Sequence, residues 1–288
     1  MKPERDPVTG RLTTGHEWNG LTELDTPVPK PVYFFLIVFL LFCVGYWLLM
    51  PAWPLGTTYT KGLLHQDERA SVTARVKAAA EQRASWTSMI EVDHAATVLE
   101  DAALMARVRE TGRTLFADNC AMCHGMEARG GPGFPSLVSG TPLWGATTDA
   151  LFQTIMVGIN SDHPDSRTSQ MPAFGRDGIL DATQIDAVVA YVRSLSQPIA
   201  PTDRIAKGRE LFAANCAACH GEGGNGNSEI GVPDLTDTRW IYGGDSASIR
   251  QSIWRGRQGH MPSWDGRLQL WQRRVLALYL VDLRRHAP

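Results

Sequence analysis

The sequence lacks a large excess of charge of either sign. Its 288 residues carry 28 Lys and Arg against 30 Asp and Glu, which gives a formal net charge of −2 at pH 7. Proteins that bind nucleic acid through its phosphates present a basic surface. We therefore predict no nucleic-acid partner. The length allows about two ordinary domains with accessory segments.

Cysteine is scarce as well, with only five in the chain. Four of them fall in two copies of one short motif, CAMCHG from Cys120 and CAACHG from Cys216, whose starts lie 96 positions apart. The fifth, Cys43, lies in an apolar run. This distribution leaves no cysteines for a framework of structural disulfides.

Long apolar runs are absent except for one. Residues 32–50 form 19 consecutive positions without a charge, and as a helix they would be about 28 Å long, close to the hydrocarbon thickness of a bilayer. Tyr33 near one end and Trp47 and Trp53 near the other are placed as interfacial anchors. A signal peptide would have a shorter apolar stretch nearer the start. We therefore predict an uncleaved transmembrane helix over 32–53 that contacts membrane lipid.

Strand-like alternation is lacking in both halves that follow, whereas helical periodicity is clear. Ile185, Val188 and Val192 fall on one stripe, and Leu268, Trp271 and Val275 recur at similar spacing. The fold class predicted is mainly α. The domain organisation predicted is a polar tail over 1–31, the transmembrane helix over 32–53, a helical spacer over 54–107, and two tandem domains over 108–197 and 203–288.

The two tandem domains repeat one another. GRTLFADNCAMCHG at 112–125 aligns without a gap against GRELFAANCAACHG at 208–221, and MPAFG from Met171 corresponds to MPSWDG from Met261. Each copy has the same order of helix, cysteine motif, loop, Met-Pro and closing helix.

The His that follows each Cys-x-x-Cys pair decides what chemistry the motif supports. In Cys-x-x-Cys-His two thiols can add to the two vinyl groups of one haem while the imidazole lies beneath the iron. A structural zinc site would need four ligands around a tetrahedral ion, and a thioredoxin-like pair would need a βαβ setting without the adjacent His. Neither context is present, so we predict two covalently bound haem c groups.

The order of these elements resembles class I cytochrome c domains. The resemblance implies that in each copy the two cysteines form thioether bonds to the haem and the adjacent His is the proximal ligand of its iron. It also implies that a methionine in the loop before the last helix is the opposite axial ligand. The residues implied to bind the cofactor are Cys120, Cys123, His124, Met171, Cys216, Cys219, His220 and Met261, of which His124, Met171, His220 and Met261 are the metal ligands.

Other features follow the same family pattern. Gly112 and Gly208 each lie eight residues before the first Cys of a motif, where they would let the opening helix cross the closing helix closely. Tyr191 and Tyr279 are the matching aromatic candidates. Two Pro-x-Leu segments, 135–137 and 233–235, resemble the turn whose carbonyl accepts the proximal His N–H.

The rivals for the sixth iron position are the neighbouring histidines. His163 lies eight residues before Met171, and His260 directly precedes Met261. We favour the methionines, with both histidines as solvated loop residues, and leave replacement by either histidine open. With both axial positions filled, neither iron has a vacancy for substrate. We therefore predict electron transfer and no catalytic residue.

Nearly the whole chain, its tail included, resembles the dihaem subunit family of cbb3-type cytochrome c oxidases. The resemblance rests on GHEWNGLTELDTPVPKP, INSDHPDSRTSQMPAFGRDG and GVPDLTDTRWIYGGDSASIRQSIWRGRQGHMPSW. It implies a non-catalytic subunit that passes electrons from a soluble cytochrome c to the monohaem and catalytic haem-copper subunits, where oxygen is reduced to water. Some members of this family carry a second membrane helix, whereas this sequence offers one credible span. Because haem attachment of this kind takes place outside the cytoplasm, we predict a single-pass protein of the bacterial cytoplasmic (inner) membrane, with its N-terminus cytoplasmic and its haem domains periplasmic.

Two other functions stay open on the residues alone. One is an anchored dihaem carrier, similar to cytochrome c4, that serves another complex. The other is a dihaem peroxidase or thiosulfate dehydrogenase, which would need a labile or unusual distal ligand in place of one of the two methionines.

Overall fold

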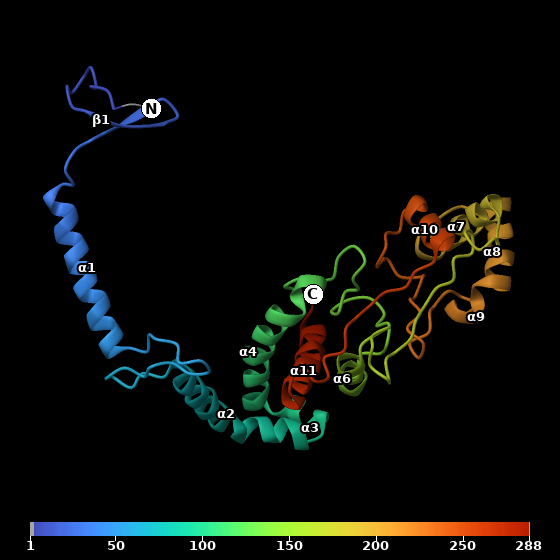
Figure 1. The fold of residues 1–288 in the computed structure, drawn as a ribbon. Helices are drawn as coiled ribbons and strands as arrows, with labels where there is room; N and C mark the ends of the chain where they lie inside the picture. The colour runs from blue at the N-terminus through green and yellow to red at the C-terminus, as the bar shows by residue number, and fades with distance from the viewer. Residues whose placement is uncertain (1–2, 288) are drawn as a thin grey trace. The chain divides into compact units, whose positions relative to one another are not determined.

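The computed structural model describes residues 3–287 and divides the chain into two units, Met1–Gln82 and Arg83–Pro288. It confirms the mainly helical fold class (Figure 1). In chain order the elements are β1 (Thr13–Trp18), β2 (Leu21–Leu24), α1 (Lys30–Leu49), α2 (Glu68–Val92), α3 (Ala95–Glu100), α4 (Ala102–Asn119), α5 (Ala121–His124), α6 (Thr148–Val157), α7 (Ala182–Ser196), α8 (Asp203–Asn215), α9 (Ala217–His220), α10 (Ser246–Arg255) and α11 (Leu270–His286).

The polar tail contains a β-hairpin that the sequence analysis missed. Strands β1 and β2 pair antiparallel, with Trp18 opposite Leu21. Asn19 and Gly20 between them have φ of 52° and 87°. Two left-handed residues joining two strands make a type I′ turn, for which Asn-Gly is the preferred pair. The sequence therefore carried a hairpin signal that overall polarity concealed.

Helix α1 matches the predicted membrane helix in its centre and differs at its ends. It runs over Lys30–Leu49 instead of 32–53, and none of its residues is buried. Pro51 accounts for the earlier end, because proline has no N–H to donate and clashes with the preceding turn. Among the described residues, α1 is the one helix long and apolar enough to cross a membrane.

The second unit contains two hydrophobic cores, and each combines segments of both sequence copies. The first lobe, as we call the core built on α4, α6 and α11, joins the opening helices of the first copy to the closing helix of the second. The second lobe, built on α7, α8 and α10, joins the closing helix of the first copy to the opening helices of the second (Figure 1). The copies have therefore exchanged their closing helices.

Two close helix crossings show the same exchange. A Cβ added to Gly112 would lie 2.7 Å from the Cβ of Tyr279, and one added to Gly208 would lie 2.8 Å from the Cβ of Tyr191. Glycine at both positions does admit a close approach, as predicted. The repeat, however, would pair each glycine with the tyrosine of its own copy, and the structure pairs each with the tyrosine of the other.

The short connection between the copies explains the exchange. Helix α7 ends at Ser196 and α8 begins at Asp203, so residues 197–202 are all that joins them. A loop of this length places consecutive helices side by side and antiparallel. Because α7 closes the first copy and α8 opens the second, their pairing leaves α4 free to pack against α11.

The loops that carry the two Met-Pro segments cross between the lobes. Ile159 and Met261 exchange two backbone hydrogen bonds, each of 2.9 Å from N to O. Met171 and Arg257 exchange another two, of 2.8 and 3.1 Å. Ile159 follows α6 of the first copy and binds the backbone of Met261 from the second copy. Arg257 follows α10 of the second copy and binds the backbone of Met171 from the first copy.

The predicted spacer contributes to the first lobe. Trp86 and Ile90 of α2 are buried at 8% and 1% exposure, and the Trp86 ring lies edge-on to Trp271 of α11, with ring centroids 5.8 Å apart. The sequence predicted this segment only as a helical spacer. The two Trp residues show that its last part packs against the core instead.

Candidate functional sites

Each cysteine motif forms a single helical turn at the end of a longer helix. Cys120 is the C-cap of α4 and the N-cap of α5, and Cys216 has the same two places between α8 and α9. Gly125 and Gly221 end the turns with φ of 74° and 77°, a left-handed conformation that glycine adopts without penalty. The two thiols and the imidazole of each motif therefore lie within one rigid turn.

The imidazole of each motif is held by a backbone carbonyl. Nδ1 of His124 lies 3.0 Å from the carbonyl oxygen of Pro135, and Nδ1 of His220 lies 3.1 Å from that of Pro233. A carbonyl can only accept, so Nδ1 carries the proton and Nε2 keeps a free lone pair. This confirms the contact predicted from the two Pro-x-Leu segments.

Burial acts on both imidazoles in the same direction. It lowers the pKa of His124 and of His220 below the usual value, and the carbonyl hydrogen bond opposes this shift in part. Both rings are therefore neutral at pH 7. A neutral imidazole with its Nε2 lone pair free is the form that binds a metal.

The half-buried thiols of Cys120 and Cys216 are poor nucleophiles. Burial, with a smaller contribution from the neighbouring cysteine, raises the pKa of Cys120 to about 11 and that of Cys216 to about 11. Reactive redox cysteines have lowered pKa values, because the thiolate is the attacking form. Cys123 and Cys219 are exposed. The pairs do not have the electrostatics of a dithiol oxidoreductase.

The two methionines lie in the lobes opposite to those that the sequence order suggests. Met261, from the second copy, packs against the first core together with Cys120. Met171, from the first copy, packs against the second core together with Cys216. Each lobe thus contains one cysteine motif and one Met-Pro segment, but the two come from different copies.

The histidines near the methionines make other contacts. His163 is not a solvated loop residue as predicted, because its side chain is 17% exposed and its Nε2 lies 3.9 Å from Asp265. Its Nδ1 accepts a hydrogen bond of 3.0 Å from the backbone N–H of Asp165. His260 is exposed, as predicted, and its Nδ1 donates to the carbonyl of Asn160 at 2.8 Å.

Across residues 3–287 no group of three or more His, Cys, Asp or Glu side chains gathers as a metal site. The residues fit a haem c instead. Each lobe offers two thiols and a neutral imidazole on one turn, and a thioether against the same core. These are the donors that covalent haem attachment and axial ligation require.

Comparison with protein families agrees with this assignment. Residues 109–196 match the family described as cytochrome c, and residues 203–280 match that described as cytochrome c oxidase, cbb3-type, subunit III. Residues 10–57 match the N-terminal domain of cytochrome oxidase-cbb3, FixP. Fold and sites together define a protein with two cytochrome c domains behind one candidate membrane helix.

Curated relatives extend the similarity over nearly the whole chain. The chain is 43% identical to the cbb3-type cytochrome c oxidase subunit FixP of Bradyrhizobium diazoefficiens, over 97% of both chains. It is 39% identical to subunit CcoP of Azospirillum brasilense over 97% of both chains, and 37% identical to that of Cereibacter sphaeroides over 98% of both. The chain belongs to the FixP/CcoP family of cbb3-type cytochrome c oxidase subunits.

Proposed function

We propose that the chain is the membrane-anchored dihaem electron-transfer subunit of a cbb3-type oxidase. One haem c is bound by Cys120, Cys123 and His124, and the other by Cys216, Cys219 and His220. The observation that carries this proposal is the pair of equivalent turns in which Nδ1 is tied to a carbonyl and Nε2 is free. The family membership of the whole chain supports the same assignment.

The axial methionines follow from the exchange of the closing segments. Met261 would supply the thioether in the first lobe, which carries His124, and Met171 would supply it in the second lobe, which carries His220. Each methionine packs against the same core as the first cysteine of the corresponding motif, which supports this pairing. Haem c, when bound, supplies an iron that carries one electron by alternating between ferric and ferrous states.

The residues set the electron affinity of each site. A thioether opposite an imidazole favours the reduced iron more than a second imidazole does, so both sites have high reduction potentials. The proximal His ring is held in one tautomer by Pro135 or Pro233, which fixes its direction. Since each lobe offers a full pair of axial donors, the subunit carries electrons and does not reduce oxygen itself.

The membrane helix sets the place of the reaction. We propose that the N-terminus lies in the cytoplasm and both haem domains in the periplasm of the bacterial inner membrane. A soluble cytochrome c would reduce the domains there. They would pass electrons to the monohaem and catalytic haem-copper subunits, where oxygen is reduced to water.

Purification of the full-length holoprotein in mild detergent tests this function. The proposal expects two haems per chain, co-purification with a haem-copper subunit, and re-oxidation by oxygen only when that subunit is present. Isolation of the dihaem chain with no haem-copper partner would favour a cytochrome c4-like carrier. Peroxide turnover by the isolated chain would show a catalytic haem and overturn the electron-transfer role.

A further inference from the structure

The two copies differ in the loop before each methionine. Thirteen positions separate the glycine after α6 from Met171, but only five separate the glycine after α10 from Met261. The first copy therefore carries eight additional residues, 160–167, which we call the insertion. Ile159, directly before the insertion, holds the backbone of Met261 through two hydrogen bonds. The insertion thus starts next to the residue that holds the methionine of the other copy.

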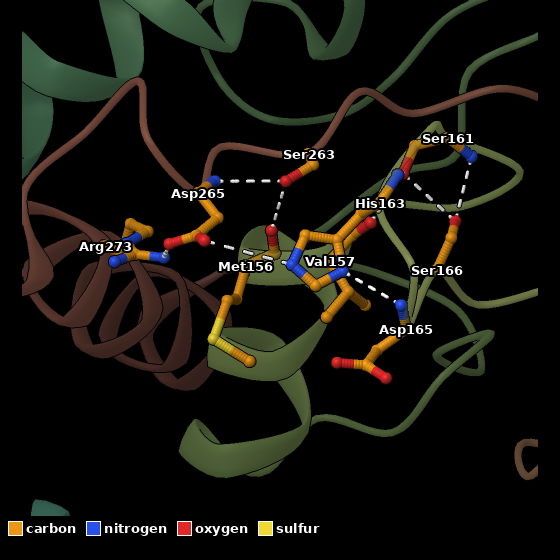
Figure 2. A network of polar contacts seen from close by, with 9 residues as sticks. All are labelled: Met156, Val157, Ser161, His163, Asp165, Ser166, Ser263, Asp265 and Arg273. Atoms are coloured by element: carbon orange, nitrogen blue, oxygen red, sulfur yellow. Dashed lines mark hydrogen bonds and ion pairs between the residues drawn. The ribbon is translucent and has the colours of Figure 1, made fainter.

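The insertion folds into a closed turn at the end of α6. The hydroxyl of Ser161 donates to the carbonyl of Val157 at 2.7 Å and lies 3.1 Å from the hydroxyl of Ser166 (Figure 2). Within the turn, Nδ1 of His163 accepts a hydrogen bond of 3.0 Å from the backbone N–H of Asp165. Because Nδ1 is the acceptor, a neutral ring carries its proton on Nε2 and can donate from there.

The loop that carries the second Met-Pro segment meets the insertion at Asp265. One carboxylate oxygen of Asp265 lies 3.9 Å from Nε2 of His163, and the other accepts a hydrogen bond from Arg273 of α11 (Figure 2). The hydroxyl of Ser263 in the same loop donates to the carbonyl of Met156 in α6 at 2.6 Å. Asp265 thus joins the insertion to α11. We call His163, Asp265 and Arg273 the polar network.

The second lobe has an isoleucine where the first lobe has Arg273. Arg273 lies four residues after Gln269, the N-cap of α11, and Ile185 lies four residues after Asp181, the N-cap of α7. Both side chains lie in the interior, since Ile185 is 0% exposed and Arg273 is 8% exposed. The two closing helices therefore bury different residues at one equivalent position, a charged residue in the first lobe and an apolar residue in the second.

Apolar packing takes the place of the polar network in the second lobe. Trp254 is the last residue but one of α10, as Met156 is of α6. A Cβ added to Gly175 would lie 2.4 Å from the Trp254 ring and 3.0 Å from Cδ1 of Ile185. The loop that carries Met171 is therefore packed closely against two apolar side chains, whereas its counterpart in the first lobe is held by polar contacts.

Core stability does not explain the burial of Arg273. Within residues 3–287 its one ion pair is with Asp265, and its Nε is buried without a hydrogen-bond partner. The desolvation of a buried ion pair offsets its Coulomb attraction, and its replacement by apolar residues is often neutral or stabilising. An isoleucine, as in the second lobe, would serve the core as well. The polar network therefore has a role other than stabilising the core.

We propose that the polar network positions Met261 as the axial ligand of the haem in the first lobe. This inference rests on the proposed haem sites and their axial methionines. On one side, the backbone of Met261 is bonded to Ile159, directly before the insertion. On the other side, Asp265 lies four residues after Met261 and is held by His163 and Arg273. Residues that orient a ligand in this way determine how well it binds its metal.

Loss of the polar network should affect one haem and spare the other. A loosened Met261 segment would keep its thioether on the iron for less of the time, and loss of thioether ligation lowers the reduction potential. The Met171 segment is held by apolar packing and should not change. The backbone amides of residues 261–268 should also exchange with solvent about tenfold faster, as expected when a hydrogen bond to a charged group is lost.

Spectroscopic redox titration of the full-length holoprotein tests the proposal, after intact mass has established two haems per chain. Met261→His and Met171→His first show which titrating component depends on each methionine. Arg273→Ile, which introduces the residue of the second lobe, should shift the Met261-dependent component to lower potential. It should also weaken the far-red absorption band that marks methionine ligation of a ferric haem. Asp265 is 48% exposed and stays solvated in this variant, so the melting temperature should not fall.

Two further variants make the test specific. His163→Asn keeps a side-chain oxygen that can accept the N–H of Asp165 but is too short to reach Asp265. It should shift the same component in the same direction, by a smaller amount than Arg273→Ile. Arg176→Gln is the matched control, because it removes an exposed arginine, paired with Asp177, from the loop of the other methionine. This control should shift neither component.

Shifts confined to the Met261-dependent component, with faster exchange of residues 261–268 and an unchanged control, would support the proposal. An Arg273→Ile holoprotein that keeps its potential, far-red band and exchange rates would overturn it. Equal shifts of both components would also overturn it, because they indicate a general loss of stability. If Arg273→Ile does not bind two haems, His163→Asn decides, since it leaves the core intact, and no shift in that variant would overturn the proposal. Fewer than two haems in the wild-type chain, or no far-red band, would refute the proposed haem sites or their axial methionines instead.

Discussion

A substitution at Gly112 tests the exchange of the closing helices. A Cβ at this position would lie 2.7 and 2.8 Å from Cβ and Cγ of Tyr279, whereas carbon atoms in contact are normally about 3.5–4.0 Å apart. Gly112→Val would therefore force α4 and α11 apart by close to 1 Å. Overpacking of this kind costs about 1–3 kcal/mol, and the small gain in helix propensity offsets only about 0.4 kcal/mol.

The assay is unfolding of the holoprotein in detergent, followed by helical signal and haem absorption. For a unit of this size each kcal/mol corresponds to a fall of about 2–4 °C in the melting temperature. Gly131→Ala is the control, because a Cβ there would have nothing within 4 Å. We expect Gly131→Ala to change the free energy of unfolding by less than about 0.5 kcal/mol, with a correspondingly small change in the melting temperature.

A double-mutant cycle identifies the partner of Gly112. If α4 packs against α11, the effects of Gly112→Val and Tyr279→Ala are coupled by about 0.5–3 kcal/mol, since the smaller side chain relieves the overlap. The effects of Gly112→Val and Tyr191→Ala should add within about 0.5 kcal/mol. Coupling to Tyr191 with additivity at Tyr279 would refute the exchange, because it would place each closing helix on its own copy.

Three further predictions follow from the same contacts. Met261→His should change the spectrum and lower the potential of the haem bound at Cys120 and Cys123, although Met261 belongs to the other copy; a change confined to the second haem in a redox titration would contradict the pairing. The hydrogen bonds of Arg109 hold the pKa of Asp282 below its usual value, so the ionised carboxylate of Asp282 stabilises the folded state. This stabilisation should be present above about pH 4 and be lost as the pH falls further. Asp282→Asn should flatten that part of the stability curve in urea titrations between pH 2 and 6, and an unchanged slope would contradict this. Residues 83–288, secreted to the periplasm without α1, should give a dihaem protein that needs no detergent, whereas loss of haem would show that the anchor is needed for folding.

The sequence predicted the features that depend on residues close together in the chain. The two Cys-x-x-Cys-His turns and the Pro-x-Leu carbonyls depend on residues a few positions apart, so spacing alone places them. The apolar run likewise predicted α1. In the tail, Asn19-Gly20 carried a hairpin signal, but the flanking strands are mostly exposed and lack a regular alternation of apolar and polar residues, so the pattern of hydrophobicity did not reveal them.

The exchange of helices could not be predicted from the repeat. The opening helices of both copies carry the same glycine, and both closing helices carry the same tyrosine, so either pairing satisfies the pattern. The choice depends on the six residues between α7 and α8, which favour a hairpin of consecutive helices.

Intact mass measurement of the purified chain, followed by sequencing of its haem-bearing peptides, tests whether the chain carries two covalently bound haems. We expect the polypeptide mass plus two haems, with one haem on the peptide that contains Cys120 and Cys123 and one on that with Cys216 and Cys219. A chain without haem, or with a single haem on either peptide, would contradict it.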